Sequence, residues 1–364
     1  MTSALLPAGF HDRLPPHADA AARLEACVLG TAFAHGYERA DPALVEFENG
    51  LAGRLKSARP QDVVRFVDPV SQKSLAIRPD ITAQIGRIAA SRMAHHPRPV
   101  RLSYAGPVLR LRGAELAPKR ERRQVGCELI GLDSVAAARE VVQIAVESLK
   151  AAGIDGISID FTLPDLVDVL AGGPMPVPAD RIDDLRDRLD AKDAGGVADI
   201  APAYLPLIEA AGPFPAALDQ LRGFDGALAS RLDGLVALAE GLDVALTIDP
   251  TERHGFEYQS WLGFSIFAAG VRGEIGRGGT YTVMHDADEE PAVGFSLYID
   301  PIVEAGGAID RRRLFVPLGA DQAEAARLRG EGWVTVAGLS ADDTPQAQLC
   351  THVLSGGGIR PVGE

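Results

Sequence analysis

Two polar residues four positions apart carry the clearest chemical signal in the chain. Gln124 and Glu128 lie in the segment RQVGCELIG, with Gly126 midway between them. Side chains alternate along a strand, so all three residues share one face if this segment is a strand. A carboxylate and an amide above a glycine floor can receive an ammonium group. The alternative is a polar sheet face covered by water or by arginine.

Asp80 is a second candidate, placed where a strand-like run passes into a helix. It precedes Ile81 and Thr82, at the expected first turn. An aspartate here is typical of a helix cap, whose carboxylate accepts a backbone N–H. Capping is the favoured interpretation from this window, but a carboxylate has two oxygens, so capping and ligand binding can coexist.

An arginine-rich loop between two strand-like runs is a candidate for anion binding. It contains Arg110, Arg112, Arg120, Arg122 and Arg123. Planar guanidinium groups match phosphate or carboxylate groups with paired hydrogen bonds. On charge alone, a solvated loop is the favoured interpretation.

Three glycines near position 278 allow a ligand to approach the backbone closely, or serve a tight turn. They are Gly276, Gly278 and Gly279 in the run GEIGRGGTY. The run lacks the GK[ST] of a phosphate-binding loop, and neither HExxH nor GxSxG occurs in the chain. We therefore expect no catalytic residue, no metal site and no cofactor.

Apolar spacing predicts an α+β framework for these residues. Helices are expected at 15–36, 81–94 and 134–152, and strands at 63–69, 74–80, 100–111, 123–132, 243–250, 263–270 and 293–298. Hairpins without a repeated strand–helix–strand rhythm favour a mainly antiparallel sheet flanked by helices. Residues 164–242 predict a helical insertion within a core of residues 1–311, and residues 312–364 a small α/β segment.

The composition of the chain limits the classes of partner that we expect it to bind. The formal net charge is −14, whereas nucleic-acid binders usually present a basic face, so a nucleic-acid partner is not expected. No apolar run reaches the roughly 18 residues that span a membrane. The N-terminus has no basic segment followed by an apolar core. We expect a cytoplasmic protein without a membrane partner.

Taken in order, these segments resemble the catalytic core of the histidyl-tRNA synthetase family, which has the class II aminoacyl-tRNA synthetase fold. The resemblance runs from about residue 5 to 305. It is carried by LLPAGFHDRLP, LAIRPDITA, RERRQVGCELIG, GFEY, GRGGTY and PAVGFSL. It implies which residues line a histidine pocket: Asp80, Thr82, Gln124, Glu128, His254 and Tyr258. It also implies that Arg110 grips ATP phosphate, and Arg120 of the same loop is a second anion candidate.

The chain departs from the family at the positions that serve catalysis. The family's third motif carries an arginine directly after its acid, but here Pro301 follows Asp300. Proline has neither a cationic group nor an N–H, so it cannot replace a phosphate contact. Tyr298 occupies a usually small position, where its ring would fill space needed by adenine. Residues 312–364 are fewer than an anticodon-binding domain of the family requires, so this segment resembles a truncated one.

A synthetase fold with these losses resembles the regulatory subunits of ATP phosphoribosyltransferase. That resemblance implies a non-catalytic protein that activates a short-form catalytic subunit in the first step of histidine biosynthesis. It further implies feedback by L-histidine and a homodimer within a hetero-oligomer. Two alternatives stay open: a divergent histidyl-tRNA synthetase-like adenylating enzyme, and a stand-alone histidine- or RNA-binding module.

Overall fold

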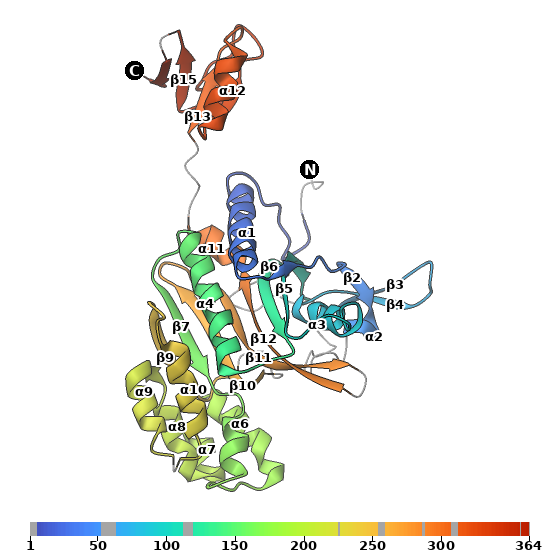
Figure 1. Ribbon diagram of the computed structural model, residues 1–364, viewed down its shortest axis with the longest axis vertical. Coiled ribbons are helices and arrows are strands. Elements are labelled where there is room, and N and C mark those ends of the chain that lie inside the picture. Colours follow the sequence, from blue (N-terminus) through green and yellow to red (C-terminus); the bar gives the residue numbers. More distant parts are fainter. Residues whose placement is uncertain are drawn as a thin grey trace. The chain divides into compact units, whose positions relative to one another are not determined.

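The chain forms two compact units, Met1–Gly307 and Ala308–Glu364. A computed structural model describes residues 6–51, 63–111, 119–224, 226–253, 259–285, 288–306, 312–356 and 358–363 (Figure 1). Within these residues, no helix is both long enough and apolar enough to cross a membrane.

A nine-stranded mixed sheet forms the centre of the first unit. Its strands, in spatial order, are β1 (Glu38–Arg39), β5 (Val100–Leu109), β6 (Glu121–Ile130), β12 (Asp288–Tyr298), β11 (Gly276–His285), β10 (Gln259–Ala268), β7 (Ile157–Thr162), β9 (Ala245–Ile248) and β8 (Gly212–Pro213). Neighbours from β5 to β7 are antiparallel, whereas β1 runs parallel to β5 and β9 runs parallel to β7. The expected α+β fold with a mainly antiparallel sheet is confirmed.

Alternation along β6 separates an apolar face of the sheet from a polar one. Val125, Cys127 and Leu129 enter the main apolar core. The helices α1 (His17–Ala34) and α4 (Val135–Ala151) supply much of the rest of that core and cover this face (Figure 1). The even-numbered residues 124–128 point to the opposite face and are buried as well. We call that opposite surface the site face.

The helix α3 (Thr82–Ser91) packs on the site face. Ile81 and Ile85 are fully buried there, in a second apolar cluster with Tyr104 and Val283. Beside it lies a three-stranded sheet with the strand order β2 (Val45–Phe47), β4 (Ser74–Ile77), β3 (Val64–Val67). The short helix α2 (Glu48–Leu51) comes between β2 and β3 in the chain. The β3–β4 hairpin confirms the predicted pair of strands.

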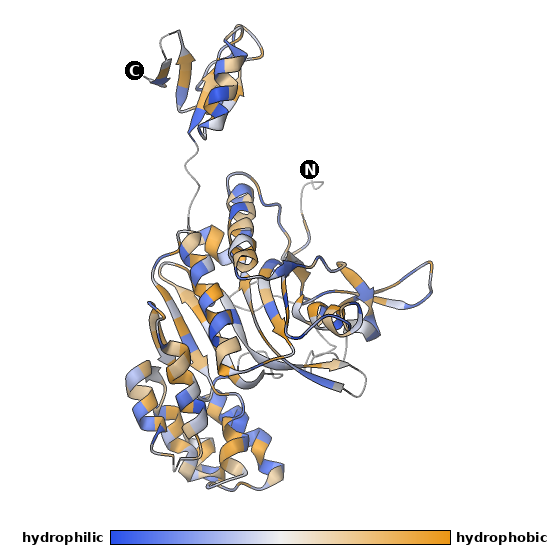
Figure 2. Cartoon of the chain, in the orientation of Figure 1, coloured by the Kyte–Doolittle hydropathy of each residue, from blue (hydrophilic) through white to orange (hydrophobic). Residues whose placement is uncertain are grey.

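The segment between β7 and β9 is helical, as predicted. It contains α5 (Leu166–Ala171), α6 (Ile182–Asp190), α7 (Ala194–Ile200), α8 (Leu205–Glu209), α9 (Phe214–Leu221), α10 (Ala229–Ala239) and the 3-10 turns Ala179–Arg181 and Pro202–Tyr204. Hydrophobic and hydrophilic residues alternate along these helices (Figure 2). The apolar faces bury Leu185, Leu207 and Leu235 in the same core as the sheet. The insertion is therefore a continuation of the first unit's core.

The second unit is a small α/β fold. It contains β13 (Arg313–Val316), α12 (Gln322–Gly330), β14 (Val334–Ala337), β15 (His352–Ser355) and β16 (Gly358–Pro361), with the strands in the order β14-β13-β15-β16. Strand β13 is parallel to both neighbours, and β15 and β16 are antiparallel.

The glycine run near position 278 lies inside β11, so the tight-turn interpretation is wrong. A Cβ on Gly278 would overlap the Phe264 ring and the Gly294 carbonyl, and one on Gly276 would overlap Leu297. These two glycines permit close packing between neighbouring strands. Gly279, one residue further on, alternates to the site face.

Gly126 should be indispensable to the sheet. A Cβ there would overlap the Phe295 carbonyl and approach the Tyr104 hydroxyl at 2.8 Å. We expect Gly126→Ala to lower the free energy of unfolding by about 1–3 kcal/mol, because backbone atoms must move. Urea unfolding measures this change.

Gly30→Ala is the matched control. Gly30 lies within α1, and a Cβ there meets no atom within 4 Å. Alanine should raise the free energy of unfolding by about 0.5–1 kcal/mol through its better helix propensity. Equal effects of the two substitutions would contradict the account of the sheet.

Candidate functional site

A buried carboxylate organises the site face. Glu128 is 1% exposed and accepts hydrogen bonds from three hydroxyl groups. Its Oε1 accepts from Thr82 Oγ1 (3.0 Å) and Tyr104 Oη (2.9 Å), and its Oε2 accepts from Tyr281 Oη (2.8 Å). The three donors come from α3, β5 and β11, so one side chain ties three elements together.

Burial controls the protonation of this carboxyl group. It raises the pKa of Glu128 from its ordinary value of 4.5 to about 8, against the opposing effect of the hydrogen bonds from Tyr281 and Tyr104. Burial, with the nearby Glu128, also raises the pKa of Tyr104. Glu128 is therefore mostly protonated near neutral pH, until a cationic group reaches it.

Glycines on the neighbouring strands make room for Glu128. Gly294 on β12 pairs directly with it, and a Cβ on Gly294 would overlap Glu128 Oε2. Gly279 on β11 pairs with Gly294, and Gly263 on β10 pairs with Gly279. Three adjacent strands thus present bare backbone on the site face, and this backbone forms a floor beside the carboxyl group.

Gln124 connects the floor to Asp80. Its Nε2 donates to Asp80 Oδ2 (3.1 Å) and to Ser296 Oγ (2.6 Å), and its Oε1 accepts the Ile81 N–H (3.1 Å). Asp80 Oδ1 accepts the Thr82 N–H (2.7 Å). The predicted hydrogen bond from a backbone N–H of the first helical turn is thus present, although the N-cap residue itself is Ile81, and the second carboxylate oxygen of Asp80 faces the polar cluster.

The structure brings together four of the six residues predicted to bind histidine: Asp80, Thr82, Gln124 and Glu128. His254 and Tyr258 lie outside the described residues. Sequence reasoning missed the other polar members of the cluster, Tyr104, Tyr281 and Ser296. Tyr104 and Ser296 both pair in register with Gly126, but that pairing cannot be read from either strand alone.

The two arginines that were predicted to bind an anion, Arg110 and Arg120, lie in different surroundings: Arg120 contacts the N-terminal segment, whereas Arg110 follows the end of β5. The Arg120 guanidinium lies 4.9 Å from the centre of the Phe10 ring, and its Nε donates to the Arg110 carbonyl (3.4 Å). It therefore helps to hold the N-terminal segment. Arg110 extends the site-face side of β5. A third arginine, Arg122, lies 5.6 Å from the centre of the Tyr298 ring.

Asp300 is a structural acid in this chain. It is 4% exposed, in the first turn of α11 (Ile299–Ala305), and Pro301 follows it in the same helix. Its carboxylate accepts hydrogen bonds from the Arg13 guanidinium and from the Arg123 backbone N–H (2.8 Å). The pair with Arg13 fastens the N-terminal segment to the end of β12.

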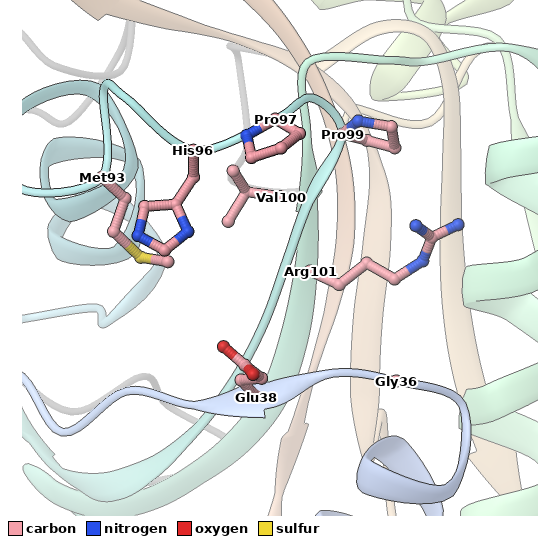
Figure 3. A pocket seen from close by; sticks show the side chains of 8 residues that line it. All are labelled: Gly36, Glu38, Met93, His96, Pro97, Pro99, Val100 and Arg101. Atoms are coloured by element: carbon pink, nitrogen blue, oxygen red, sulfur yellow. The ribbon is translucent and has the colours of Figure 1, made fainter.

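A surface pocket of about 190 Å³ lies at the β1–β5 edge. It is lined by Gly36, Glu38, Met93, His96, Pro97, Pro99, Val100 and Arg101. Figure 3 shows Met93 and His96 together across from Glu38, with the Arg101 side chain directed away. Arg101 Nε donates to Glu140 (2.8 Å). None of the predicted site residues lines this pocket.

The buried cluster is therefore the site best suited to a small polar ligand. Two carboxyl groups and an amide converge there beside a floor of bare backbone. These acceptors match the several N–H donors of an amino group or an imidazole. The cluster is a recognition surface made of acceptors and hydroxyls.

Comparisons of sequence find relatives along the whole chain. A family model described as "Histidyl-tRNA synthetase" matches residues 9–302. A protein of Rhodospirillum centenum named "ATP phosphoribosyltransferase regulatory subunit" is 44% identical over 375 residues, covering 99% of this chain and 96% of the relative. A protein of the same name from Paramagnetospirillum magneticum is 41% identical, covering 99% and 98%.

Comparisons of structure agree on the fold. A Bacillus halodurans protein, described as an ATP phosphoribosyltransferase regulatory subunit/histidyl-tRNA synthetase, aligns with a TM-score of 0.79 at 22% identity, covering 96% of this chain and 97% of that chain. A chain of the ATP phosphoribosyl transferase (HisG:HisZ) complex of Thermotoga maritima aligns with a TM-score of 0.61 at 21% identity, covering 77% and 97%.

Glu128 should impose a pH dependence on stability. The folded chain keeps its proton up to about pH 8, whereas the unfolded carboxyl group loses it near 4.5. Between these values the folded state binds more protons, so the free energy of unfolding falls as pH rises, by up to about 1.4 kcal/mol per pH unit. Glu128→Gln should make this slope shallower in urea unfolding measured from pH 5 to 8, and most clearly above pH 7, because burial also raises the pKa of Glu252, to about 7, and that group contributes below this pH.

Asp184→Asn is the control for this measurement. The Asp184 carboxylate accepts a hydrogen bond from Arg188 (3.1 Å), which lowers the pKa of Asp184 below its ordinary value of 3.8. Its contribution to stability is present above pH 3.8 and is lost only in more acidic solution, so the slope from pH 5 to 8 should persist. An unchanged slope in Glu128→Gln would contradict the assignment to Glu128.

Proposed function

We propose that this chain, which belongs to the histidyl-tRNA synthetase family and, within it, to the ATP phosphoribosyltransferase regulatory subunits, performs no catalysis of its own. In this proposal it binds the short-form catalytic subunit of ATP phosphoribosyltransferase and raises that subunit's activity. L-Histidine is the effector, and the buried cluster around Glu128 is its site.

The observation that carries the proposal is the environment of Asp300. A synthetase of this family places an arginine for ATP directly after the acid. Here that position is Pro301, and the acid itself is buried in contact with Arg13 and the Arg123 backbone. A proline offers phosphate neither charge nor an N–H donor. The loss of this contact favours a binding role over adenylation.

Tyr298 supports the same conclusion. Its side chain is 4% exposed and lies at the end of β12 against the Arg122 guanidinium. A ring in this position occupies the space that a small residue would leave for adenine. The ATP site of a synthetase is therefore altered at both its base and its phosphate positions.

The acceptor cluster supports the choice of effector. Asp80, Gln124 and Glu128 can receive the amino group and the imidazole of histidine, whose positive charge would favour the ionised form of the buried Glu128 and would pair with the half-buried Asp80 carboxylate. In the described state, Gln124 and the hydroxyl donors satisfy these groups internally. Histidine must replace some of these bonds, so its binding can favour one conformation over another and couple to the partner subunit.

A homodimer within the complex is also part of the proposal. Large apolar side chains are exposed on and beside the small β2-β4-β3 sheet: Leu44 (44%), Phe47 (50%), Phe66 (42%), Val67 (65%) and Val70 (90%). Apolar surface gathered in this way is typical of a protein–protein contact. Because class II folds commonly dimerise through their first motif, a second copy of the chain is the partner that we propose, by analogy with the family.

The first test is activation. We expect the short-form catalytic subunit to copurify with this chain, in a complex whose mass accounts for paired copies of the chain. The rate of condensation of ATP with phosphoribosyl pyrophosphate should rise as the chain is added and level off at a fixed ratio. A rate that does not change on addition would overturn the regulatory role. Pyrophosphate exchange that requires both histidine and ATP would instead establish the adenylating enzyme.

The second test is histidine binding to the complex. We expect calorimetric titration to detect L-histidine, and Asp80→Asn to weaken binding by about tenfold or more, because a charge-assisted hydrogen bond is lost. Asp184→Asn in the insertion is the control and should bind as the parent does. If the chain activates the catalytic subunit but the complex does not bind histidine, the proposed effector site is wrong, whereas the proposed activating role stands.

A further inference from the structure

A pair of carboxyl groups connects β7 to the residues that follow β9. Asp160 on β7 and Glu252 share a hydrogen bond, and both residues are half-buried. Asp160 pairs in register with Thr247 of β9, whose hydroxyl donates to the Asp160 carboxylate. We call Asp160 and Glu252 the carboxyl pair, and residues 249–253 the β9 turn.

The β9 turn is bonded both to β7 and to the junction between α6 and α7. The Asp249 N–H donates to a backbone carbonyl of β7 (2.9 Å). From the junction, Lys192 Nζ donates to Asp249 Oδ1 (2.5 Å) and to Thr251 Oγ1 (2.6 Å). The Arg253 N–H donates to Asp190 Oδ1 at the end of α6 (2.8 Å). Because buried leucines anchor α6 in the core, the turn lies between two fixed elements.

The hydrogen bond within the carboxyl pair requires a proton, because an ionised carboxylate can only accept. Burial, followed by the negative charge of Asp160, raises the pKa of Glu252 from its ordinary value of 4.5 to about 7. Burial raises the pKa of Asp160 as well, but there the Thr247 hydroxyl and the charge of Lys192 act against it. Glu252 is therefore the protonated donor below neutral pH, and Asp160 is the acceptor.

The cations around the carboxyl pair are already engaged. Among the described residues, the charged groups on the elements packed around the pair come from the turn, the α6–α7 junction and the segment from the β10–β11 connection into β11: Asp249, Arg253, Asp190, Lys192, Glu274 and Arg277. Each cation of this group forms an ion pair: Lys192 with Asp249, Arg277 with Glu274, and Arg253 with Asp187. Loss of the proton from Glu252 therefore places two like charges at hydrogen-bond distance, where they repel each other.

We infer that the proton shared by Asp160 and Glu252 is a pH-sensitive switch that holds the β9 turn against β7. While Glu252 is protonated, the carboxyl pair closes the turn onto the strand. When both groups are ionised, the turn opens locally and leaves its bonds to β7 and to the junction. Glu252 comes two residues before His254 in the chain, so the switch sets the position from which that segment begins. The inference does not rest on the regulatory role, because the switch lies within the chain itself.

Hydrogen exchange of the full chain from pH 5 to 9 tests the switch. The Asp249 and Arg253 N–H groups report on it, because their hydrogen bonds join the β9 turn to β7 and to the junction. Their exchange rates, divided by the intrinsic rate at each pH, give the equilibrium constant for opening. We expect this constant to rise by up to about tenfold per pH unit until about pH 7 and then to level off, because opening releases one proton. A constant that does not change with pH would overturn the switch.

Two variants separate the carboxyl pair from the rest of the turn. In Glu252→Gln the side-chain amide donates to Asp160 at every pH, and in Asp160→Asn the pair carries at most one charge. We expect both variants to lose most of the rise in the opening constant. Asp184→Asn on α6 is the control and should keep the rise of the parent, because its carboxylate bonds to Arg188. A parent-like rise in either variant would overturn the switch. Each variant tests it alone, so if one fails to fold, the other decides.

Discussion

The burial of one carboxyl group, that of Glu128, is the constraint on which the site face depends. A buried carboxyl group needs donors, and here they are hydroxyls from a helix and from two strands that are not neighbours. It also needs space, which the adjacent strand provides by having glycine opposite. The bare backbone of Gly294, Gly279 and Gly263 then extends this space across three strands. The position of the Glu128 side chain, the protonation of its carboxyl group and the glycine floor beside it are therefore linked. A substitution that changes one of them alters the other two.

Much of this arrangement could be predicted from local patterns. The period of two along residues 124–128 correctly placed Gln124 and Glu128 on one face, and the position of Asp80 correctly indicated its hydrogen bond with the first turn of α3. The partners of Glu128 could not be predicted, because Tyr104 and Tyr281 reach it through strand pairing between segments far apart in sequence. Arg120 was a candidate on charge alone, but its stacking on Phe10 depends on where the N-terminal segment lies. Local periodicity predicts the face of the sheet toward which a side chain points. Its hydrogen-bond partners depend on which strands pair, and this cannot be predicted from one segment alone.

At the end of β12, the residues that maintain the fold differ from those on which catalysis by a synthetase depends. Positions that pack in a synthetase-like sheet, such as Phe295 and Leu297, remain buried and apolar. At the positions that the family resemblance assigns to ATP, the Arg122 guanidinium lies near the Tyr298 ring, and Asp300 accepts hydrogen bonds from Arg13 and from the backbone of Arg123. The same strand end has thus become part of the protein's internal structure. A fold is kept by its apolar positions, while its activity depends on a few polar ones that can change without loss of the sheet.

The position of β12 in the sheet also affects how the chain folds during its synthesis. This strand occupies the middle of the nine-stranded sheet, between β6 and β11, although its residues are among the last of the first unit to be made. During synthesis β6 is complete more than a hundred residues before its partner emerges, and the contact of Arg13 with Asp300 spans 287 positions. Such distant pairings make folding slow and leave a strand edge exposed while it waits. A polypeptide interrupted before residue 288 would lack the central strand and keep the edge of β6 open to other chains, so translational pauses and truncations in this region favour aggregation.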